Sequence, residues 1–336
     1  MKYKTLGKSG IKVSEIGFGA WTIGLDWWGK KIEEGEAKRM LKKAYDLGIN
    51  FFETADMYGK GISEKLIGQV FKGMREEVVI STKYGYDFSK VEQIGHAELP
   101  QSFEPEFTRK ALSASLERLQ TDYVDSYGMH NPKLNHIRND ITFDTFDKLI
   151  QEGKIRSSQV ALGPAIGWTQ EGLEAMERKS VSAIQTVYNI LEQTPGNELI
   201  EKAEKQNVGI LVRVPDASGI LTGKVKAETV IPSNDHRKDR KQEWRQDALR
   251  KVEQFRPIAE RNGLNITEFA IKFILSKKSI ASVLPTVVSV EEIETFATIS
   301  DGRYLNSSDM KEIDDLYNTW PSYELKGRVQ KMGCNN

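Results

Sequence analysis

The sequence of 336 residues contains one cysteine and four histidines, and its charges balance. Cys334 stands alone near the C-terminal end and has no partner for an intramolecular disulfide, so a reducing compartment is expected. With 48 basic and 48 acidic residues, no overall positive field attracts nucleic acid or an anionic membrane. We therefore expect any anion-binding site to be local, and no nucleic-acid partner.

Long apolar runs are also missing. No segment approaches the roughly 18 apolar residues of a membrane-spanning helix, and the first seven residues lack the apolar core of a signal peptide. We therefore expect a cytoplasmic protein without membrane contact. Apolar residues still make up 39% of the chain, which is enough for a sizeable core under a well-charged surface.

The order of β-rich and amphipathic runs predicts the fold. Short β-rich runs alternate with longer amphipathic runs, which indicates parallel strands covered by helices. Strands are predicted at 16–19, 50–54, 78–83, 123–129, 159–163, 183–188, 208–214 and 283–285, and helices at 34–47, 63–71, 108–119, 143–151, 170–177, 198–205, 244–261 and 290–298. An open doubly wound sheet is the alternative, but the Gly-x-Gly-x-x-Gly turn expected after its first strand is not present. Eight units predict an α/β fold closed into a (β/α)8 (TIM) barrel.

Smaller features complete the predicted organisation. Extended runs at 3–6 and 13–15 predict an N-terminal β-hairpin. No Pro/Gly/Ser-rich linker divides the chain, so we assign residues 1–336 to a single barrel domain. The connections 84–106 and 222–243 are too long for simple turns. The composition of the charged loop 222–243, after the seventh strand, favours a solvated, mobile segment.

Reactive side chains end three consecutive predicted strands. Glu53 ends one strand and is followed by Tyr58, Lys83 ends the next, and the third runs into His130. Because barrel enzymes place catalytic groups at the carboxyl ends of their strands, these four side chains are expected to meet at one mouth. Each alone has an ordinary structural explanation, but together they indicate proton transfer.

The residue types suit that chemistry. A tyrosine normally titrates near about 10, and an adjacent ammonium favours its phenolate, so we expect Lys83 to bring the pKa of Tyr58 closer to neutral pH. Glu53 is expected to hold Lys83 in place. His130 would orient a substrate carbonyl while Tyr58 donates a proton to it.

These residues also carry a family resemblance. The segment Glu53-Thr-Ala-Asp-Met-Tyr-Gly59 resembles the Asp-Thr-Ala-x-x-Tyr-Gly pattern of the aldo-keto reductases. Further matching segments include Gly17-Phe-Gly-Ala-Trp-Thr-Ile-Gly24, Ser81-Thr-Lys83, Asp122-Tyr-Val-Asp125, Gly153-Lys-Ile-Arg156 and Gly219-Ile-Leu-Thr-Gly-Lys224. The resemblance implies hydride transfer between NAD(H) or NADP(H) and an aldehyde, ketone or sugar-like substrate. It makes Tyr58 the general acid/base, tuned by Lys83 and Glu53, and His130 the group that positions the carbonyl, with no metal.

The resemblance also implies binding residues. The expected cofactor-binding residues are Gly19, Ala20, Trp21, Gln185, Arg213, Ser218, Lys224 and Ser289. Among them, Arg213 takes the place of a tyrosine that stacks on the nicotinamide in many members. At predicted loops on top of the barrel, we expect Trp27, Trp28 and Tyr84 to line a substrate pocket, with Tyr86 as a further candidate. The charged loop 222–243 has a second interpretation here, as a cationic lid over a phosphate or carboxylate.

Several positions depart from the family pattern. Glu53 is one methylene longer than the usual aspartate, and Val160-Ala161-Leu162-Gly163-Pro164 replaces the Ser-Asn pair that commonly holds the nicotinamide amide. Asp216 places a carboxylate near the expected pyrophosphate. Val288 replaces the cation that usually pairs with a 2′-phosphate, so we expect NADH to bind at least as well as NADPH. These departures leave two alternatives open: a lyase or epimerase that retains a tightly bound nicotinamide, and a cofactor-sensing regulatory subunit.

Overall fold

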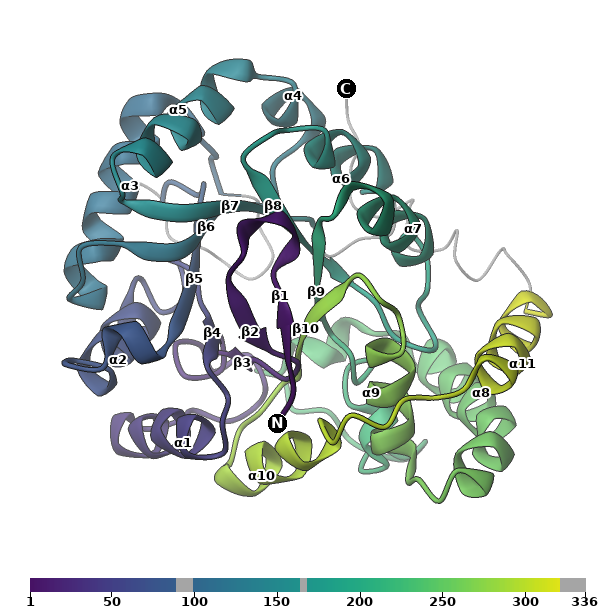
Figure 1. The fold of residues 1–336 in the computed structure, drawn as a ribbon. Helices are drawn as coiled ribbons and strands as arrows, with labels where there is room; N and C mark the ends of the chain where they lie inside the picture. Colours follow the sequence, from purple (N-terminus) through teal and green to yellow (C-terminus); the bar gives the residue numbers. More distant parts are fainter. Residues whose placement is uncertain (89–98, 164–167, 321–336) are drawn as a thin grey trace.

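The computed structural model describes residues 1–88, 99–163 and 168–320, so Cys334 and Pro164 lie outside the described residues (Figure 1). Eight parallel strands lie side by side in chain order. They are β3 (Phe18–Gly19), β4 (Phe51–Glu53), β5 (Val79–Tyr84), β6 (Val124–His130), β7 (Ile155–Ala161), β8 (Val181–Val187), β9 (Gly209–Arg213) and β10 (Ile280–Leu284).

The sheet closes between its first and last strands. A parallel bridge joins Ile16 to Val283, where the backbone N–H of Gly17 donates to the Val283 carbonyl at 2.8 Å. At Gly17 a Cβ would lie 2.8 Å from the side chains of Phe51 and Leu284, so only glycine fits at this closure. The predicted (β/α)8 barrel is confirmed.

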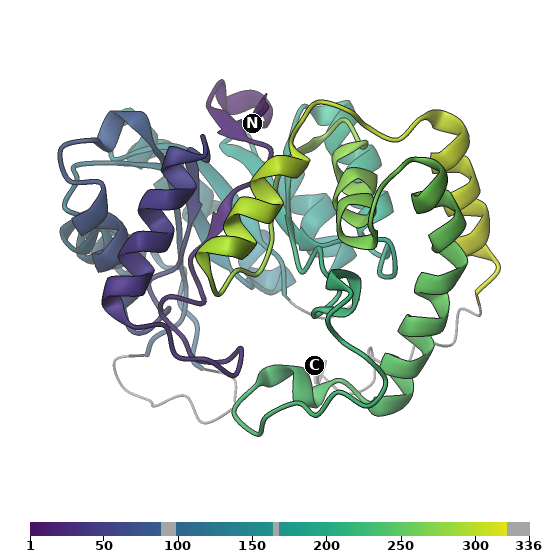
Figure 2. The same ribbon diagram turned by 90° about the horizontal axis from the view of Figure 1, so that it is seen from below.

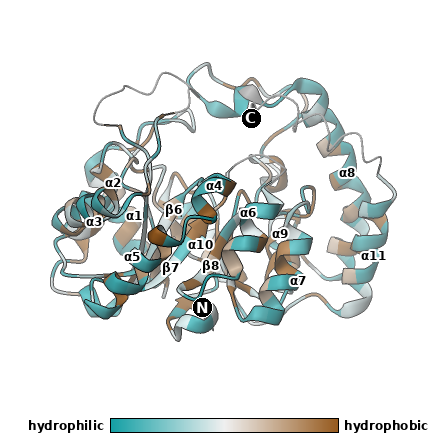
Figure 3. Cartoon of the chain, turned by 90° about the horizontal axis from the view of Figure 1, so that it is seen from above, coloured by the Kyte–Doolittle hydropathy of each residue, from teal (hydrophilic) through white to brown (hydrophobic). Residues whose placement is uncertain are grey.

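Helices cover the outside of the barrel, and Figure 3 shows their hydrophilic surfaces facing outward. They are α1 (Glu34–Asp46), α2 (Ile62–Val70), α3 (Pro105–Leu119), α4 (Leu134–Ile137), α5 (Asp140–Gln151), α6 (Thr169–Met176), α7 (Gly196–Gln206), α8 (Gln242–Arg261), α9 (Ile266–Leu275), α10 (Val290–Ile299) and α11 (Ser307–Asn318). Sequence reasoning missed α4, α9 and α11. Residues 269–275 of α9 are all buried, and the periodicity of such a short, mostly apolar run does not distinguish a helix from a buried strand. Figure 2 shows α8 and α11 side by side at the edge of the molecule.

The predicted N-terminal hairpin is also present. Strands β1 (Tyr3–Thr5) and β2 (Lys12–Ser14) pair antiparallel. Its apolar side chains Leu6, Ile11 and Val13 form one buried cluster with residues of β4, β5, β8, β9 and β10. The hairpin therefore covers the end of the barrel opposite the strands' carboxyl ends. A ligand would bind at the other end.

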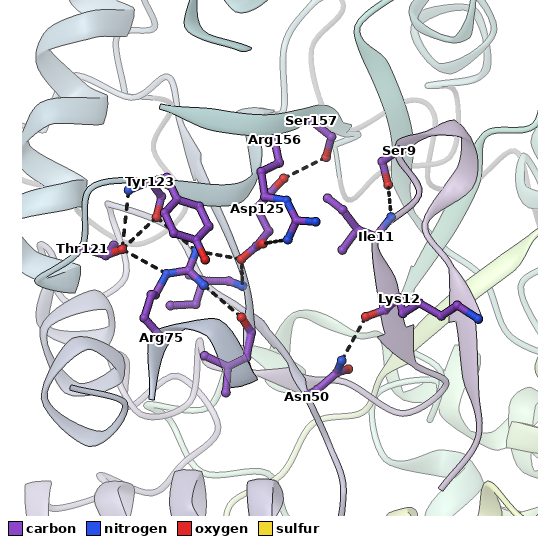
Figure 4. A network of polar contacts seen from close by, with 12 residues as sticks. Ser9, Ile11, Lys12, Asn50, Arg75, Thr121, Tyr123, Asp125, Arg156 and Ser157 are labelled. Atoms are coloured by element: carbon purple, nitrogen blue, oxygen red, sulfur yellow. Dashed lines mark hydrogen bonds and ion pairs between the residues drawn. The ribbon is translucent and has the colours of Figure 1, made fainter. Parts of the chain in front are cut away.

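A buried carboxylate joins three strands near this plugged end (Figure 4). Asp125 on β6 is 1% exposed and accepts hydrogen bonds from Arg75 Nη2 at 2.7 Å and Arg156 Nη1 at 2.6 Å. It also accepts from the backbone N–H of Ile80 on β5, at 2.9 Å. Because a buried charge is tolerated only when it is paired and hydrogen-bonded, Asp125 fixes the arrangement of β5, β6 and β7.

We expect Asp125→Ala to lower the free energy of unfolding by about 3 kcal/mol, because two arginines and a buried N–H lose their acceptor. Urea denaturation measures this change. Glu152→Ala is the matched control: it removes an exposed pair with Arg109 on α3 and should cost less than about 1 kcal/mol. Equal losses in the two variants would show that Asp125 has no special part in the barrel.

Candidate active site

The four predicted reactive residues meet at the open mouth. Lys83 is fully buried; its Nζ donates to Glu53 Oε1 and to the Thr54 carbonyl, the latter at 2.6 Å. The same nitrogen lies 4.9 Å from the centroid of the Tyr58 ring. The His130 ring stands perpendicular to that ring, with 5.9 Å between centroids. The predicted juxtaposition is therefore present.

A network of short contacts fixes the loop that carries Tyr58. The hydroxyl of Thr54 donates to Ser63 Oγ at 2.8 Å, and Ser63 Oγ donates to the Ala20 carbonyl at 2.7 Å. Gly59 has φ +62°, and a Cβ there would lie 2.5 Å from the Gly24 carbonyl oxygen. The β3–α1 and β4–α2 loops thus pack backbone to backbone, which limits the movement of Tyr58.

Glu53 holds two partners at once. Besides Lys83, its Oε1 accepts a hydrogen bond from Gln185 Nε2 on β8 at 3.0 Å. Both Glu53 and Gln185 are buried. The glutamate therefore links strands on different sides of the barrel mouth, and the carboxylate that anchors the ammonium is itself held in place.

Burial determines the protonation state of the phenol. Burial raises the pKa of Tyr58, and the negative charge of Glu53 raises it further. The positive charges of Lys83 and Arg213 lower it. The net result is a pKa above the usual value for tyrosine. The expectation that Lys83 brings this pKa closer to neutral pH is therefore wrong in its net direction, because desolvation outweighs the ammonium. At neutral pH Tyr58 is a protonated donor.

The imidazole is neutral for a related reason. Burial, together with the positive charges of Lys83 and Arg213, holds the pKa of His130 well below its usual value. Its Nδ1 is buried and has no hydrogen-bond partner among the described residues. Its ring also meets the Tyr86 ring edge-on, with 5.3 Å between centroids. His130 is thus a neutral group with free hydrogen-bonding capacity beside a protonated phenol.

Tyr84 is not part of the mouth. It is fully buried, stacks on Tyr127 with 4.7 Å between centroids, and hydrogen-bonds to Thr108 of α3 at 2.7 Å. Since successive side chains of a strand point to opposite faces and Lys83 faces the mouth, Tyr84 faces the helices. The prediction that it lines a substrate pocket is wrong, and Tyr86 lies there instead, with its hydroxyl accepting from Asn131 Nδ2 at 2.9 Å.

Arg213 ends β9 on the other side of the mouth. Its Nη2 donates to the carbonyl of Leu162, and its Nε is buried without a hydrogen-bond partner among the described residues. Burial lowers the pKa of Arg213, against the effect of Tyr58, Glu53 and Tyr86. A guanidinium nevertheless stays charged at neutral pH.

The charged loop is folded. We call residues 223–241 the strap. Asp235 is fully buried and accepts from both the backbone N–H and the guanidinium of Arg237, while Arg240 pairs with buried Glu192 at 2.8 Å. The expectation of a solvated segment is wrong for Arg237 and Arg240, whose acidic partners lie within the fold, whereas Lys238 and Lys241 are exposed.

The strap contacts the β3–α1 loop, which contains Trp27 and Trp28. Trp28 forms an antiparallel bridge with Asp235, and the Arg237 guanidinium lies 4.1 Å from the centre of the Trp28 ring. The backbone N–H of His236 donates to the Trp27 carbonyl at 2.9 Å, and its ring packs against Trp21. Figure 2 shows the strap crossing one end of the barrel between this loop and α8.

A strained backbone follows β9. Val214, Ala217 and Ser218 have φ of +55°, +49° and +58°, values that are rare for residues other than glycine and that cluster at functional sites. Ser218 Oγ accepts from Arg240 Nε at 3.1 Å. Backbone amides in such left-handed turns form concave anion sites, so this segment has the character expected of a phosphate site.

Asp216 lies within the same strained segment. Asp216 is 4% exposed, and this burial raises the pKa of its carboxyl to about 7. Hydrogen bonds from the backbone N–H groups of Asp216 and Ser218, and the positive charge of Arg237, act against this rise. One of its oxygens, Oδ1, has no hydrogen-bond partner in the part of the chain that the structure describes. The carboxyl is therefore largely uncharged below neutral pH and ionised above it.

The N-terminus of α10 holds the remaining predicted binding residues. Ser289 Oγ caps it by accepting from the Glu292 N–H at 3.4 Å, and Lys224 pairs with Glu292 at 2.8 Å. The Val288 carbonyl accepts from Lys30 Nζ at 3.0 Å. Sequence reasoning missed Lys30, because its 258-residue separation from Val288 leaves no local signal.

The described residues include no helix with the length and hydrophobicity to span a membrane, and no cluster of three or more His, Cys, Asp or Glu side chains suited to a metal ion.

Comparisons with known proteins agree with this architecture. The chain is 29% identical over 327 residues to aldo-keto reductase YhdN of Bacillus subtilis, covering 94% of this chain and 93% of that one. It is 29% identical over 304 residues to the NADH-specific methylglyoxal reductase of Escherichia coli, covering 87% and 91%. The holo form of aldo-keto reductase AKR11C1 from Bacillus halodurans superposes with a TM-score of 0.76 at 26% identity, covering 94% and 96%. Because the profile of the Aldo/keto reductase family matches residues 15–318, this chain belongs to that family of oxidoreductases.

Proposed function

We propose that the chain is a cytoplasmic, single-domain carbonyl reductase that uses NADH or NADPH to reduce an aldehyde, ketone or sugar-like carbonyl. The observation that carries this proposal is the buried Lys83–Glu53 pair beneath a protonated Tyr58, with neutral His130 beside it. A side chain set to donate a proton and a neutral hydrogen-bonding group facing the same space are what reduction of a carbonyl requires.

The chain's own residues supply position and the proton. An N–H group of the neutral His130 imidazole orients the carbonyl oxygen of the substrate, and Tyr58 gives that oxygen its proton. Lys83 stabilises the phenolate that remains, while Glu53 keeps the ammonium in place. A bound nicotinamide supplies the hydride. Trp27, Trp28 and Tyr86 line the entrance and limit the access of water.

The residues present fit such a cofactor. Gln185 and Arg213 border the mouth beside Tyr58, and Arg213 Nε and His130 Nδ1 are buried polar atoms without hydrogen-bond partners in residues 1–88, 99–163 and 168–320. Gly19 ends β3, and Ala20 and Trp21 lie on the loop that follows it. The left-handed turn at 214–219, with Ser218, is suited to the pyrophosphate, and Lys224, Lys30 and Ser289 surround the expected adenosine end.

Two positions near the expected nicotinamide are unusual. Leu162 and Gly163 follow β7 where polar side chains commonly hold the carboxamide, and the Leu162 carbonyl is bound by Arg213. A Cβ on Gly163 would lie 2.0 Å from the Trp168 ring, so that ring packs directly on the backbone. We propose that backbone groups and Arg213 hold the carboxamide end in place of those side chains.

The role of Tyr58 is tested by Tyr58→Phe, which removes the proton donor and leaves the ring. Carbonyl reduction should fall by roughly 100-fold or more, as for other general acids, while the dissociation constant of the reduced cofactor changes little. Steady-state rates and cofactor fluorescence titration measure the two effects. Turnover close to that of the unchanged protein would remove Tyr58 from the mechanism.

Cofactor affinity should depend on pH through Asp216. The pKa of Asp216 in the folded protein is about 7, against 3.8 for a free side chain. The carboxyl is therefore neutral below pH 7, ionises above it, and then repels a pyrophosphate. NADH should bind several-fold more weakly at pH 8 than at pH 6, and Asp216→Asn should flatten this dependence. An unchanged pH dependence in the variant would place Asp216 away from the phosphates.

Cofactor choice is predicted from α10. Val288 offers no cation, and the charge of Lys224 is neutralised by Glu292. We expect NADH to bind at least as tightly as NADPH, and Val288→Arg to improve NADPH binding relative to NADH by at most about 1.5–3 kcal/mol, the contribution of one charge-assisted hydrogen bond. Fluorescence titrations with both cofactors test this.

Selectivity of the unchanged protein for NADPH would contradict this argument. Lys30→Met would then show whether the exposed ammonium beside Val288 supplies the missing charge.

A further inference from the structure

Arg213 has no carboxylate paired with it among the described residues, whereas Lys83 and Glu53 neutralise each other in a direct ion pair. Tyr58 and His130 are uncharged at neutral pH. The Nη2 of Arg213 donates to the Leu162 carbonyl, which is a neutral acceptor. The guanidinium therefore brings a positive charge to the mouth that no ion pair among the described residues balances.

This charge lies where a hydride donor must approach. Hydride and proton add to the two atoms of one carbonyl bond, so a donor serving a carbonyl held by Tyr58 and His130 must lie within a few ångströms of both. Arg213 exerts an electrostatic effect on each of these two side chains. Its strand pairs with β8, in the register Val187 to Arg213, so it also lies on the Gln185 side of the mouth.

The donor changes charge in the reaction. Reduction transfers two electrons and one proton as hydride to the carbonyl carbon, Tyr58 adds a proton to the oxygen, and the neutral dihydronicotinamide ring becomes a cationic nicotinamide ring. The partly buried guanidinium of Arg213 repels that cation and leaves the neutral reduced ring unaffected. In a partly buried site, one charge–charge contact is enough to change an equilibrium constant tenfold.

We propose that Arg213 makes this site discriminate between redox states of the nicotinamide, binding the reduced form more tightly than the oxidised form. The inference rests on the proposed function and adds a preferred direction of the reaction to it. After each reduction the oxidised cofactor is held less tightly, which favours its release and sets the chain for carbonyl reduction over alcohol oxidation.

The experiment measures binding and requires no turnover. Dissociation constants of NADH, NAD⁺, NADPH and NADP⁺ are determined by calorimetry or protein fluorescence for the unchanged protein and three variants. Arg213→Gln removes the charge but can still donate to the Leu162 carbonyl, whereas Arg213→Lys keeps the charge. Arg109→Gln removes a charge from the exposed surface of α3, outside the barrel, and serves as the control for overall charge.

We expect the unchanged protein to bind the reduced form at least tenfold more tightly than the oxidised form of the same cofactor. That ratio should fall at least fivefold in Arg213→Gln and stay within about threefold in Arg213→Lys and Arg109→Gln. Equal affinity for both redox states in the unchanged protein would overturn the inference without any variant, and so would a ratio that survives in a folded Arg213→Gln protein. Binding of none of the four cofactors would instead refute the proposed function.

Discussion

The site depends on a single buried ion pair. Lys83 is completely removed from solvent, and an unpaired ammonium in such a place would cost several kcal/mol. Glu53 provides the compensating charge from the neighbouring strand, and the β4–β5 register, which sets Glu53 opposite Ser81, brings the two side chains together at the mouth. The ammonium beneath Tyr58 and its effects on the pKa values of Tyr58 and His130 depend on this pair.

The same rule governs the strap. Its composition resembles that of a solvated loop, yet Arg237 and Arg240 find buried carboxylates in Asp235 and Glu192. Asp235 is in turn covered by Gly29, where a Cβ would lie 3.0 Å from its carboxylate oxygen. Charge pairing inside the fold thus turns a hydrophilic segment into an ordered part of the barrel mouth and joins it to the loop of Trp27 and Trp28.

Burial and charge have separate effects at the mouth. Desolvation keeps Tyr58 protonated and His130 neutral, which suits proton donation to a carbonyl, while Arg213, which has no ion-pair partner among the described residues, leaves a positive charge on the side proposed for the cofactor. Both effects support the proposed preference for reduction. The ordinary pKa values of the separate side chains do not contain this preference, because it arises from the low-dielectric surroundings that they share.

The sequence alone determined the closed eight-stranded barrel, the N-terminal hairpin and the approach of Glu53, Tyr58, Lys83 and His130. Periodicity and strand-end position are local properties of the chain, and parallel strands bring their carboxyl ends to one edge. The family-like segment around Tyr58 pointed to the same four residues.

Only the tertiary structure decided the features that depend on contacts between residues far apart in the sequence. It placed Tyr84 among the outer helices, because Tyr84 is one residue from Lys83 on β5 and points to the opposite face. It placed Tyr86, beyond the end of β5, against His130 at the mouth. It revealed α9, whose short buried run does not by itself distinguish a helix from a strand, and the link from Lys30 to Val288. It also reversed the expected pKa shift of Tyr58, because residue order carries no measure of how completely the folded chain excludes water.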